Sequence, residues 1–321
     1  LFSGIAIAIT VALYFLFVRK QAQRHWPDVR KGLFIFLTEV AIKIASRLPY
    51  HPKIWKPNLL VPVENPRDWV GMVDCLRAIA YPKGRIDFFS VVSSESAEQT
   101  EEEKKKREED FSLITEPLKE EGLLATARIV EAAHIKEGAL VVTQTVVGSV
   151  LSPNVLFVKL GVEPQKDEML KSIVEKGQSL GLGTLVFRLN PKSAFGQKQK
   201  VNLWIKQGSP NIHLAILISL QLEKNWEAKL RIVQVVDEEK QKAQAEEYLQ
   251  KLKRLMRISK EAEIHVAIGT FEGALLEVPQ ADINIFGMAE EVNFALIRSV
   301  SDKICTSVLF LRDSEHEKAV V

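Results

Sequence analysis

The sequence predicts an α/β protein whose body consists of two tandem halves, each with a mostly parallel sheet and helices on both faces. Short apolar runs rich in β-branched residues alternate with helical stretches from residue 55 onward, as in parallel sheets crossed by helices. Hydrophobic residues make up 46% and charged residues 26% of the 321 residues, a composition typical of globular proteins. A shift of 144 residues places Pro66 on Pro210 and Leu76 on Leu220. Both windows then predict strand, Pro-led helix and strand, which indicates an internal repeat.

Residues 1–18 form an uncharged apolar run followed by Arg19, Lys20 and Arg24. As a helix this run is about 27 Å long, close to the hydrocarbon thickness of a bilayer. We expect it to be the end of a last transmembrane helix, and the positive residues after it place the rest of the chain in the cytoplasm. A buried core helix is the alternative. Because the first residue is Leu1 rather than Met, we also expect a longer protein.

Residues 19–54 are expected to contain a connecting amphipathic helix. Apolar residues recur there at helical spacing, at Leu33, Leu37, Val40, Ile44 and Leu48. Such a helix has three possible partners: the membrane surface, a second subunit, or the body of its own chain. The sequence leaves these three possibilities open.

The body that follows is divided into elements by its apolar runs and turn residues. Ten strands are expected, at residues 59–63, 86–92, 123–130, 155–160, 185–189, 201–205, 230–236, 264–268, 283–286 and 307–311. Helices are expected around residues 67–80, 111–121, 137–149, 166–180, 211–223, 239–258 and 289–302. The polar segment 193–199 separates the halves, which gives subdomains at residues 55–196 and 197–321.

Residues 93–110 form a charged, low-complexity segment within the first subdomain. Glu101 and Lys105 stand at helical i,i+4 spacing, as do Glu102 and Lys106. We assign the segment as a solvated charged loop, with a solvated helix as the other interpretation. Ser93 and its polar neighbours would accept phosphate if the segment were regulatory.

Charge and motif content exclude several classes of function. Lys and Arg total 43 against 41 Asp and Glu, without the basic excess of a nucleic-acid binder. The six histidines and the two cysteines, Cys75 and Cys305, show no metal-ligand spacing. The nucleophile-elbow, zinc-protease, Walker A and dinucleotide motifs are missing from the sequence. We therefore assign no catalytic residue, metal or cofactor, and expect the chain not to be an enzyme.

Gly138, Gly148 and Ser149 form a partial motif, with nine residues between the two glycines. The spacing resembles the end of the universal stress protein pattern, in which backbone amides and a hydroxyl hold the phosphates of ATP. Ile135 stands where that pattern has its first glycine, which removes a close approach to phosphate. The resemblance implies two universal-stress-protein-like halves and makes these three residues weak candidates for nucleotide binding.

Three longer stretches together resemble the cytoplasmic C-terminal domain of the cation-chloride cotransporters. The first is IWKPNLLVPVENP at 54–66, which resembles the strand that opens that domain. The second is VNLWIKQGSPNIHLAILISLQLEKNWEAKLRIVQVV at 201–236, the most specific of the three. The third is the ending SVLFLRDSEHEKAVV at 307–321. The resemblance spans essentially the whole chain and includes the order membrane helix, connecting helix and two α/β halves.

This resemblance implies a non-catalytic regulatory and dimerisation domain on the cytoplasmic side of the cell membrane. Its partners would be its own transmembrane transport domain and a second copy of the chain. Sodium, potassium and chloride would be bound by that membrane domain, which the chain lacks. Because only the short run 93–110 stands where eukaryotic members carry long insertions, the resemblance implies a compact prokaryotic member.

Two other functions stay open at this point. The first is a nucleotide-sensing, universal-stress-protein-like domain tethered to a membrane protein, which depends on Gly138, Gly148 and Ser149. The second is a soluble α/β enzyme whose site has no familiar motif. Millimolar ATP would bind in the first case, and an enzyme would need polar groups that converge in a pocket.

Overall fold

The computed structural model describes residues 4, 10–12, 14, 29–45, 47, 55–93, 97–149 and 151–319. The chain divides into two compact units, Leu1–Tyr50 and His51–Val321.

The first unit contains the helix α2 (Val29–Ala45), within the segment where the connecting helix is expected. Its apolar residues Leu33, Phe34, Ile35, Phe36 and Leu37 are all exposed. The expected transmembrane helix at 1–18 lies, but for five residues, outside the described part of the chain. Among the residues that are described, none of the helices has the length and apolar character needed to cross a bilayer.

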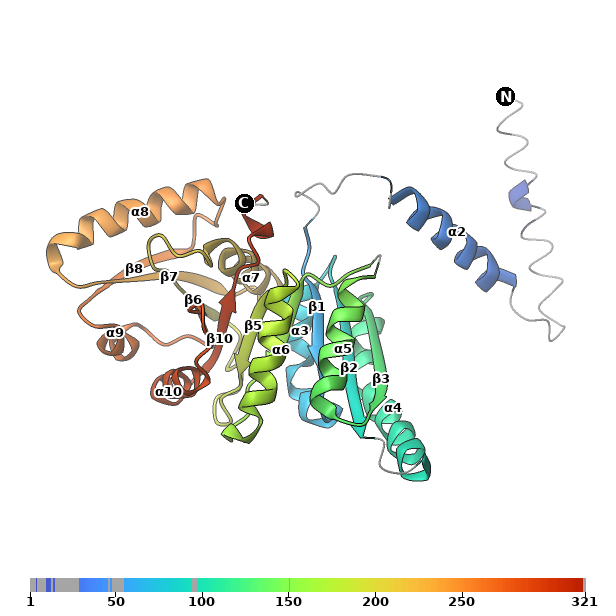
Figure 1. The fold of residues 1–321 in the computed structure, drawn as a ribbon. Coiled ribbons are helices and arrows are strands. Elements are labelled where there is room, and N and C mark those ends of the chain that lie inside the picture. The colour runs from blue at the N-terminus through green and yellow to red at the C-terminus, as the bar shows by residue number, and fades with distance from the viewer. Residues whose placement is uncertain are drawn as a thin grey trace. The chain divides into compact units, whose positions relative to one another are not determined.

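The second unit is built on one ten-stranded sheet (Figure 1). Its strands are β1 (Asn58–Pro62), β2 (Arg85–Ser93), β3 (Leu124–Ala132), β4 (Val155–Lys159), β5 (Gly183–Arg188), β6 (Lys200–Trp204), β7 (Lys229–Val236), β8 (Glu263–Ile268), β9 (Ile283–Gly287) and β10 (Ser307–Arg312). They lie in the order β3-β2-β1-β4-β5-β10-β9-β6-β7-β8. Each half thus arranges its own five strands in the same order, from third to second, first, fourth and fifth.

Neighbouring strands are parallel everywhere except where the halves meet. There β5 and β10 pair antiparallel, and Val186 lies opposite Phe310. The two strands stand at the same place in their own halves, so an approximate two-fold axis passes through this pair. The two expected sheets are therefore joined into one, because the exposed edge of each half pairs with that of the other.

Helices cover both faces of the sheet. One face carries α3 (Val73–Ala80), α4 (Ala97–Glu120), α7 (Ile212–Trp226) and α8 (Lys242–Leu255), and the other carries α5 (Ile135–Val147), α6 (Asp167–Ser179), α9 (Phe271–Glu277) and α10 (Phe294–Ile304). Short 3-10 turns precede several of them, among them Pro66–Met72 before α3. Each face thus receives two helices from each half, as in a doubly wound fold.

A line of aromatic rings connects the halves on the first face. Phe157 stacks on Phe187 at 5.9 Å between ring centroids, and Phe187 on Phe195 at 5.5 Å. Phe195 in turn meets Trp226 of α7 edge-on at 5.7 Å. The core of this face is therefore continuous across the junction between the halves, which makes the second unit one cooperative body rather than two loosely linked ones.

The structure confirms all ten expected strands and the mostly parallel α/β fold. Two expectations about helices are corrected. Residues 97–110 of the charged segment form a helix rather than a loop, as in the other interpretation of the sequence, because α4 begins at Ala97 and runs through them, with Arg107 bonded to Glu103 one turn earlier. The helix α9 was not expected; it has only seven residues, too few for a helical period to show.

Candidate functional site

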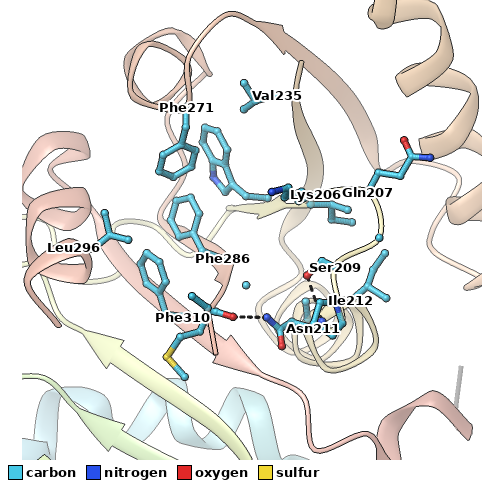
Figure 2. Close-up of a pocket in the computed structure, with 18 of the residues that line it drawn as sticks. Lys206, Gln207, Ser209, Asn211, Ile212, Val235, Phe271, Phe286, Leu296 and Phe310 are labelled. Carbon is cyan, nitrogen blue, oxygen red and sulfur yellow. Dashed lines mark hydrogen bonds between the residues drawn. The ribbon is translucent and has the colours of Figure 1, made fainter. Parts of the chain in front are cut away.

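A cavity of about 830 Å³ opens at the carboxyl ends of β6 and β9 in the second half (Figure 2). From β6 the chain crosses through α7 to β7 on one side, whereas β9 lies on the other side. The strand order therefore reverses between β6 and β9. Such a switch point is where open α/β sheets bind ligands, because the two connections leave it in opposite directions and create a crevice.

The loop between β6 and α7 supplies the polar wall of this cavity, with Lys206, Gln207, Ser209 and Asn211 (Figure 2). Gly208 turns the chain there with a φ of +77°, a value that glycine adopts at little cost. The amide of Asn211 donates to the backbone carbonyl of Met288 at 2.6 Å. Its side-chain oxygen accepts from the backbone N–H of Asp313 at 3.2 Å. Asn211 thus ties this loop to the segments that follow β9 and β10.

Aromatic rings supply the opposite wall. Trp204 and Phe286 stack at 5.3 Å, and Phe286 and Phe310 at 4.9 Å. Phe271 meets both Trp204 and Phe286 edge-on at 5.9 Å. Trp204 is fixed by its indole N–H, which donates to Asn284 at 2.9 Å. Phe271 remains 40% exposed at the cavity, so this wall presents an aromatic surface to a planar or apolar group.

The charges around the cavity are of both signs. The positively charged Lys206 lines the cavity together with the acidic residues Asp237, Glu290 and Glu291. Glu291 accepts a hydrogen bond from Lys171 of α6 at 2.7 Å, which lowers the pKa of that carboxyl. No three His, Cys, Asp or Glu side chains among the described residues gather as metal ligands. The arrangement is therefore suited to binding a small molecule, and its polar groups do not form a nucleophile–base pair.

The equivalent position in the first half carries a larger side chain. Val155 of β4 pairs with Leu59, and Ile283 of β9 pairs with Val201. Four residues further along each strand stand Lys159 in the first half and Gly287 in the second. A large side chain thus occupies the place where the second half has none.

Lys159 is held at this position by contacts within the first half. Its ammonium donates to the backbone carbonyl of Asp68 at 2.7 Å and lies 5.8 Å from the centre of the Trp69 ring. Burial lowers the pKa of Lys159, and the charge of Asp68 opposes that shift. Gly287, by contrast, lets the end of β9 approach the loop after β6, because a Cβ there would lie 3.2 Å from the Asn211 amide nitrogen.

The three residues that the sequence nominates for nucleotide binding lie in the first half, away from this cavity. Gly138 lies in the first turn of α5, whereas Gly148 ends that helix and Ser149 follows it. The nine residues between the glycines are helical, which separates the two by about 15 Å. A Cβ on Gly138 would lie 2.7 Å from both Val91 Cγ1 and Ala132 Cβ. The structure therefore does not bring these residues together, and it places Gly138 in close packing.

Sequence reasoning missed the loop 206–211 and the aromatic wall. One signal was available: Gly208, Ser209, Pro210 and Asn211 follow a strand and precede a helix, the order of a ligand-binding loop in α/β proteins. The wall itself had no sequence signal. Trp204, Phe271, Phe286 and Phe310 come from four separate elements, and only the fold brings them together.

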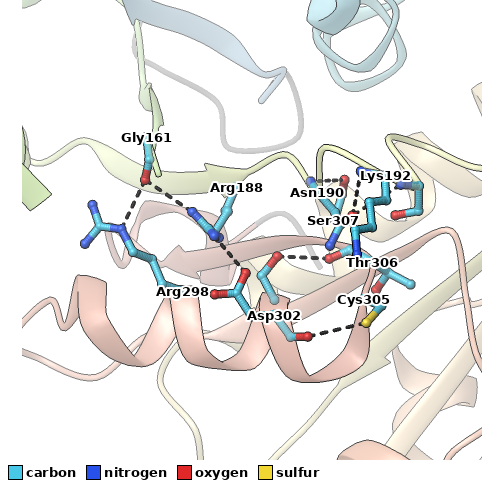
Figure 3. Close-up of polar contacts among 11 residues, drawn as sticks. Gly161, Arg188, Asn190, Lys192, Arg298, Asp302, Cys305, Thr306 and Ser307 are labelled. Carbon is cyan, nitrogen blue, oxygen red and sulfur yellow. Dashed lines mark hydrogen bonds and ion pairs between the residues drawn. The ribbon is translucent and has the colours of Figure 1, made fainter. Parts of the chain in front are cut away.

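The junction between the halves carries a second group of polar contacts (Figure 3). Arg188 of β5 donates to Asp302 of α10 at 2.8 Å, and also to the backbone carbonyl of Gly161 at 3.2 Å. Arg298 donates to the same carbonyl at 3.1 Å and pairs with Asp167 at 2.6 Å. These bonds join α10 of the second half to the first half, so they fix the angle between the two halves.

Comparison with known proteins agrees with this architecture. Residues 61–195 match the first C-terminal domain of the prokaryotic cation-chloride cotransporter family, and residues 196–320 match the second. The crystal structure of the cytoplasmic domain of a prokaryotic cation chloride cotransporter superposes with a TM-score of 0.70 at 30% identity, covering 83% of this chain and 99% of that one. None of the curated proteins compared with the chain matches it.

A more distant likeness concerns the fold alone. A universal stress protein from Archaeoglobus fulgidus DSM 4304 superposes with a TM-score of 0.51 at 13% identity, covering 79% of this chain and 95% of that one. This agrees with the universal-stress-protein-like strand order of the halves. On the strength of the two family matches and the crystal structure, the chain belongs to the prokaryotic cation-chloride cotransporters and corresponds to their cytoplasmic C-terminal domain.

Proposed function

We propose that this chain is a non-catalytic regulatory and dimerisation domain, with subdomains at residues 55–196 and 197–321. It acts on the cytoplasmic side of the cell membrane and couples the assembly of two subunits to ion transport. Transport itself belongs to a separate membrane domain, which binds chloride with sodium, potassium or both. Family membership supports this proposal.

One structural observation carries the proposal furthest: the two halves share one sheet and one continuous core. A body of this kind moves as a unit. A contact that displaces one half therefore displaces the other half with it. A shift in subunit contacts then biases the transporter between two states if those states differ in contact free energy.

The first experiment is light scattering over a concentration series, on the body of the chain from about Lys53 onward. This removes the apolar start, which would cause association of its own. We expect a dimer whose fraction rises with concentration. A monomer at every concentration would contradict dimerisation by this body and leave a regulatory role through the membrane domain alone.

The cavity favours a second function, the sensing of a small molecule such as a nucleotide. Its position at the strand-order reversal and its aromatic wall support this candidate. The mixed charges of the rim weigh against a strongly anionic ligand, because Glu290 and Asp237 repel phosphate.

Calorimetric titration with ATP up to millimolar concentration tests this candidate, with Gly287→Lys as the matched variant. That substitution gives the second half the residue that stands at the equivalent position in the first half, Lys159. Binding to the original chain and loss of binding in the variant would support nucleotide sensing. If neither protein binds ATP, or if the original chain and Gly287→Lys bind it equally well, this cavity is not a nucleotide site.

A further inference from the structure

Two buried carboxyl groups meet where the chain turns after β10. Asp313 and Glu317 belong to a short segment, residues 313–317, which we name the C-terminal turn. The Asp313 side chain is 2% exposed, and Glu317 is fully buried. Asp313 lies close enough to Glu317 to act on its pKa. Two buried carboxyl groups at such close range cannot both ionise at low cost, so one of them favours its neutral form.

The surroundings decide which carboxyl group favours its neutral form. Asp313 accepts a hydrogen bond from the backbone N–H of Leu214 at 3.3 Å, at the amino end of the 15-residue helix α7. A helix amino end stabilises negative charge. Among the described residues, Glu317 accepts hydrogen bonds from the backbone N–H and the hydroxyl of Ser314, at 3.0 and 2.8 Å, and both donors are neutral. These surroundings favour the protonated form of Glu317.

The turn contacts both halves of the protein. Asp313 holds the first turn of α7 through Leu214, and its own backbone N–H donates to Asn211. On the other side, a Cβ on Gly183 of β5 would lie 3.2 Å from Glu317 Oε1. Glycine at this position thus lets the turn lie against the start of β5. Because Asn211 also lines the cavity, the turn is connected to the polar wall described above.

We propose that the C-terminal turn is a proton-dependent clasp, which holds the amino end of α7 against the start of β5 while Glu317 is neutral and releases it when Glu317 ionises. Ionisation of the fully buried Glu317 would place a second negative charge beside Asp313, and no salt bridge to Glu317 is present among the described residues to offset it. The clasp depends on the contacts of the second unit alone and stands whether or not the domain dimerises.

The direction of the pH effect follows from where the proton binds. Burial, together with the neighbouring Asp313, raises the pKa of Glu317 from 4.5 to about 8. Between these two values the docked turn holds a proton that the undocked turn has lost. Docking is therefore strongest at low pH and weakens as the pH rises, by up to about tenfold per pH unit.

Several other titratable groups lie near the pair. On α7, His213 Nδ1 lies 3.6 Å from Asp313 Oδ2. On the turn itself, Glu315 and His316 are exposed. Arg312, just before the turn, is directed elsewhere, toward Gln178 and the backbone carbonyl of Glu290. His213 is thus the group in direct contact with Asp313, and it is substituted as a control.

Hydrogen exchange of the full chain tests the proposal, with rates divided by the intrinsic exchange rate at each pH. The readouts are the amides of Leu214 and Ser314, and amides of β1 report that the body stays folded. We expect protection in the original chain to fall steeply from pH 5 to about 8 and then to level off. Glu317→Gln keeps a neutral donor at the same place, so its protection should be level over this range.

Two control variants separate the clasp from other causes. Glu315→Gln removes an exposed carboxylate of the same turn and should follow the original chain. His213→Gln should leave the steep fall above pH 7 in place. Level protection in the original chain, or an equally steep fall in Glu317→Gln, overturns the proposal. A carbon-13 titration of the Glu317 carboxyl gives an independent check, since a midpoint at the ordinary 4.5 instead of about 8 also overturns it.

Discussion

Arg188 and Arg312 occupy equivalent positions on the two central strands and reach across the junction in opposite directions. Arg188 of β5 lies opposite Val308, and Arg312 of β10 lies opposite Thr184. Each stands two residues beyond the pair of Val186 and Phe310 through which the approximate two-fold axis passes.

Their contacts repeat the same symmetry. Arg188 donates to Asp302 on α10 of the other half and to the backbone carbonyl of Gly161 in its own half. Arg312 donates to Gln178 on α6 of the other half and to the backbone carbonyl of Glu290 in its own half. The junction within this chain is thus organised like the self-complementary interface of a two-fold dimer, with the exception that Asp302 is charged and Gln178 is neutral.

This exception leads to the first prediction. Asp302→Ala leaves the Arg188 guanidinium, whose side chain is 6% exposed, without its carboxylate. We expect it to lower the free energy of unfolding by about 1–3 kcal/mol, less than for a fully buried pair because Asp302 itself is exposed. Arg188→Met removes the buried charge itself, so no unpaired charge is left. It should therefore lower the free energy of unfolding by less than Asp302→Ala does. Urea denaturation curves measure both.

Gln178→Ala serves as the matched control on the other side of the axis. It removes a neutral hydrogen bond to Arg312 and should cost about 1 kcal/mol. If Arg188→Met proves more damaging than Asp302→Ala, the packing of the arginine outweighs its ion pair and the electrostatic account of the junction is wrong.

The second prediction concerns Asp282, which fixes the connection between the halves. Its carboxylate accepts backbone N–H bonds from Gln197 at 3.0 Å, Gln199 at 2.7 Å and Lys200 at 2.8 Å. We expect Asp282→Ala to lower the free energy of unfolding by about 2–4 kcal/mol and to speed proteolytic cleavage within residues 193–199. Asp282→Asn keeps one acceptor oxygen, so its free energy of unfolding should lie between that of the original chain and that of Asp282→Ala. Unchanged cleavage in Asp282→Ala would show that the connection is fixed by other contacts.

The third prediction separates packing from phosphate binding at Gly138. A Cβ at this position would press on Val91 and Ala132, so Gly138→Ala should cost about 1–3 kcal/mol of stability. Gly148→Ala is the control, because the nearest atom to its Cβ would be the Thr145 carbonyl oxygen at 3.6 Å; it should change stability by less than about 0.5 kcal/mol. Thermal unfolding without nucleotide measures both. Equal effects would mean that the close packing at Gly138 is relieved by small shifts of α5.

The fourth prediction uses the two thiols as probes of the folded state. Cys75 is fully buried in α3, and burial strongly raises the pKa of its thiol. Cys305 is exposed at the end of α10. Because the thiolate is the reactive form, Ellman's reagent should titrate one thiol in the native chain and two in guanidinium. Fast reaction of both in native buffer would show that α3 opens readily.

The local pattern of the sequence was sufficient for the strands. Most strands are short apolar runs such as Leu185, Val186 and Phe187, bounded by turn residues, because both faces of the sheet are buried there. The edge strands β3 and β8 are more exposed and more polar. The segment 93–110 was assigned as a loop because the i,i+4 Glu–Lys pairs within it are a weak helix signal in the absence of an apolar face. The buried face of α4 lies beyond this segment, in the second half of the helix, and consists of Phe111, Ile114 and Leu118.

The candidate site was predictable only in part. The repeat and the alternation of elements imply parallel sheets, whose ligand sites lie at the carboxyl ends of strands. The cavity in the second half is lined by Gly287, where the first half has Lys159 at the equivalent position. The two residues become comparable only once the strand register places both at the end of the fourth strand of their halves.

By itself, the sequence determined the α/β class, the ten strands, the two-fold repetition and the family resemblance, because these depend on residue pattern along a short stretch of chain. Tertiary structure decided how the halves join, which residues line the cavity and that Glu317 lies beside Asp313. These depend on contacts between distant residues, such as β5 with β10 and the C-terminal turn with α7. Such contacts are set by the packing of the whole body, so the local composition of the sequence does not predict them.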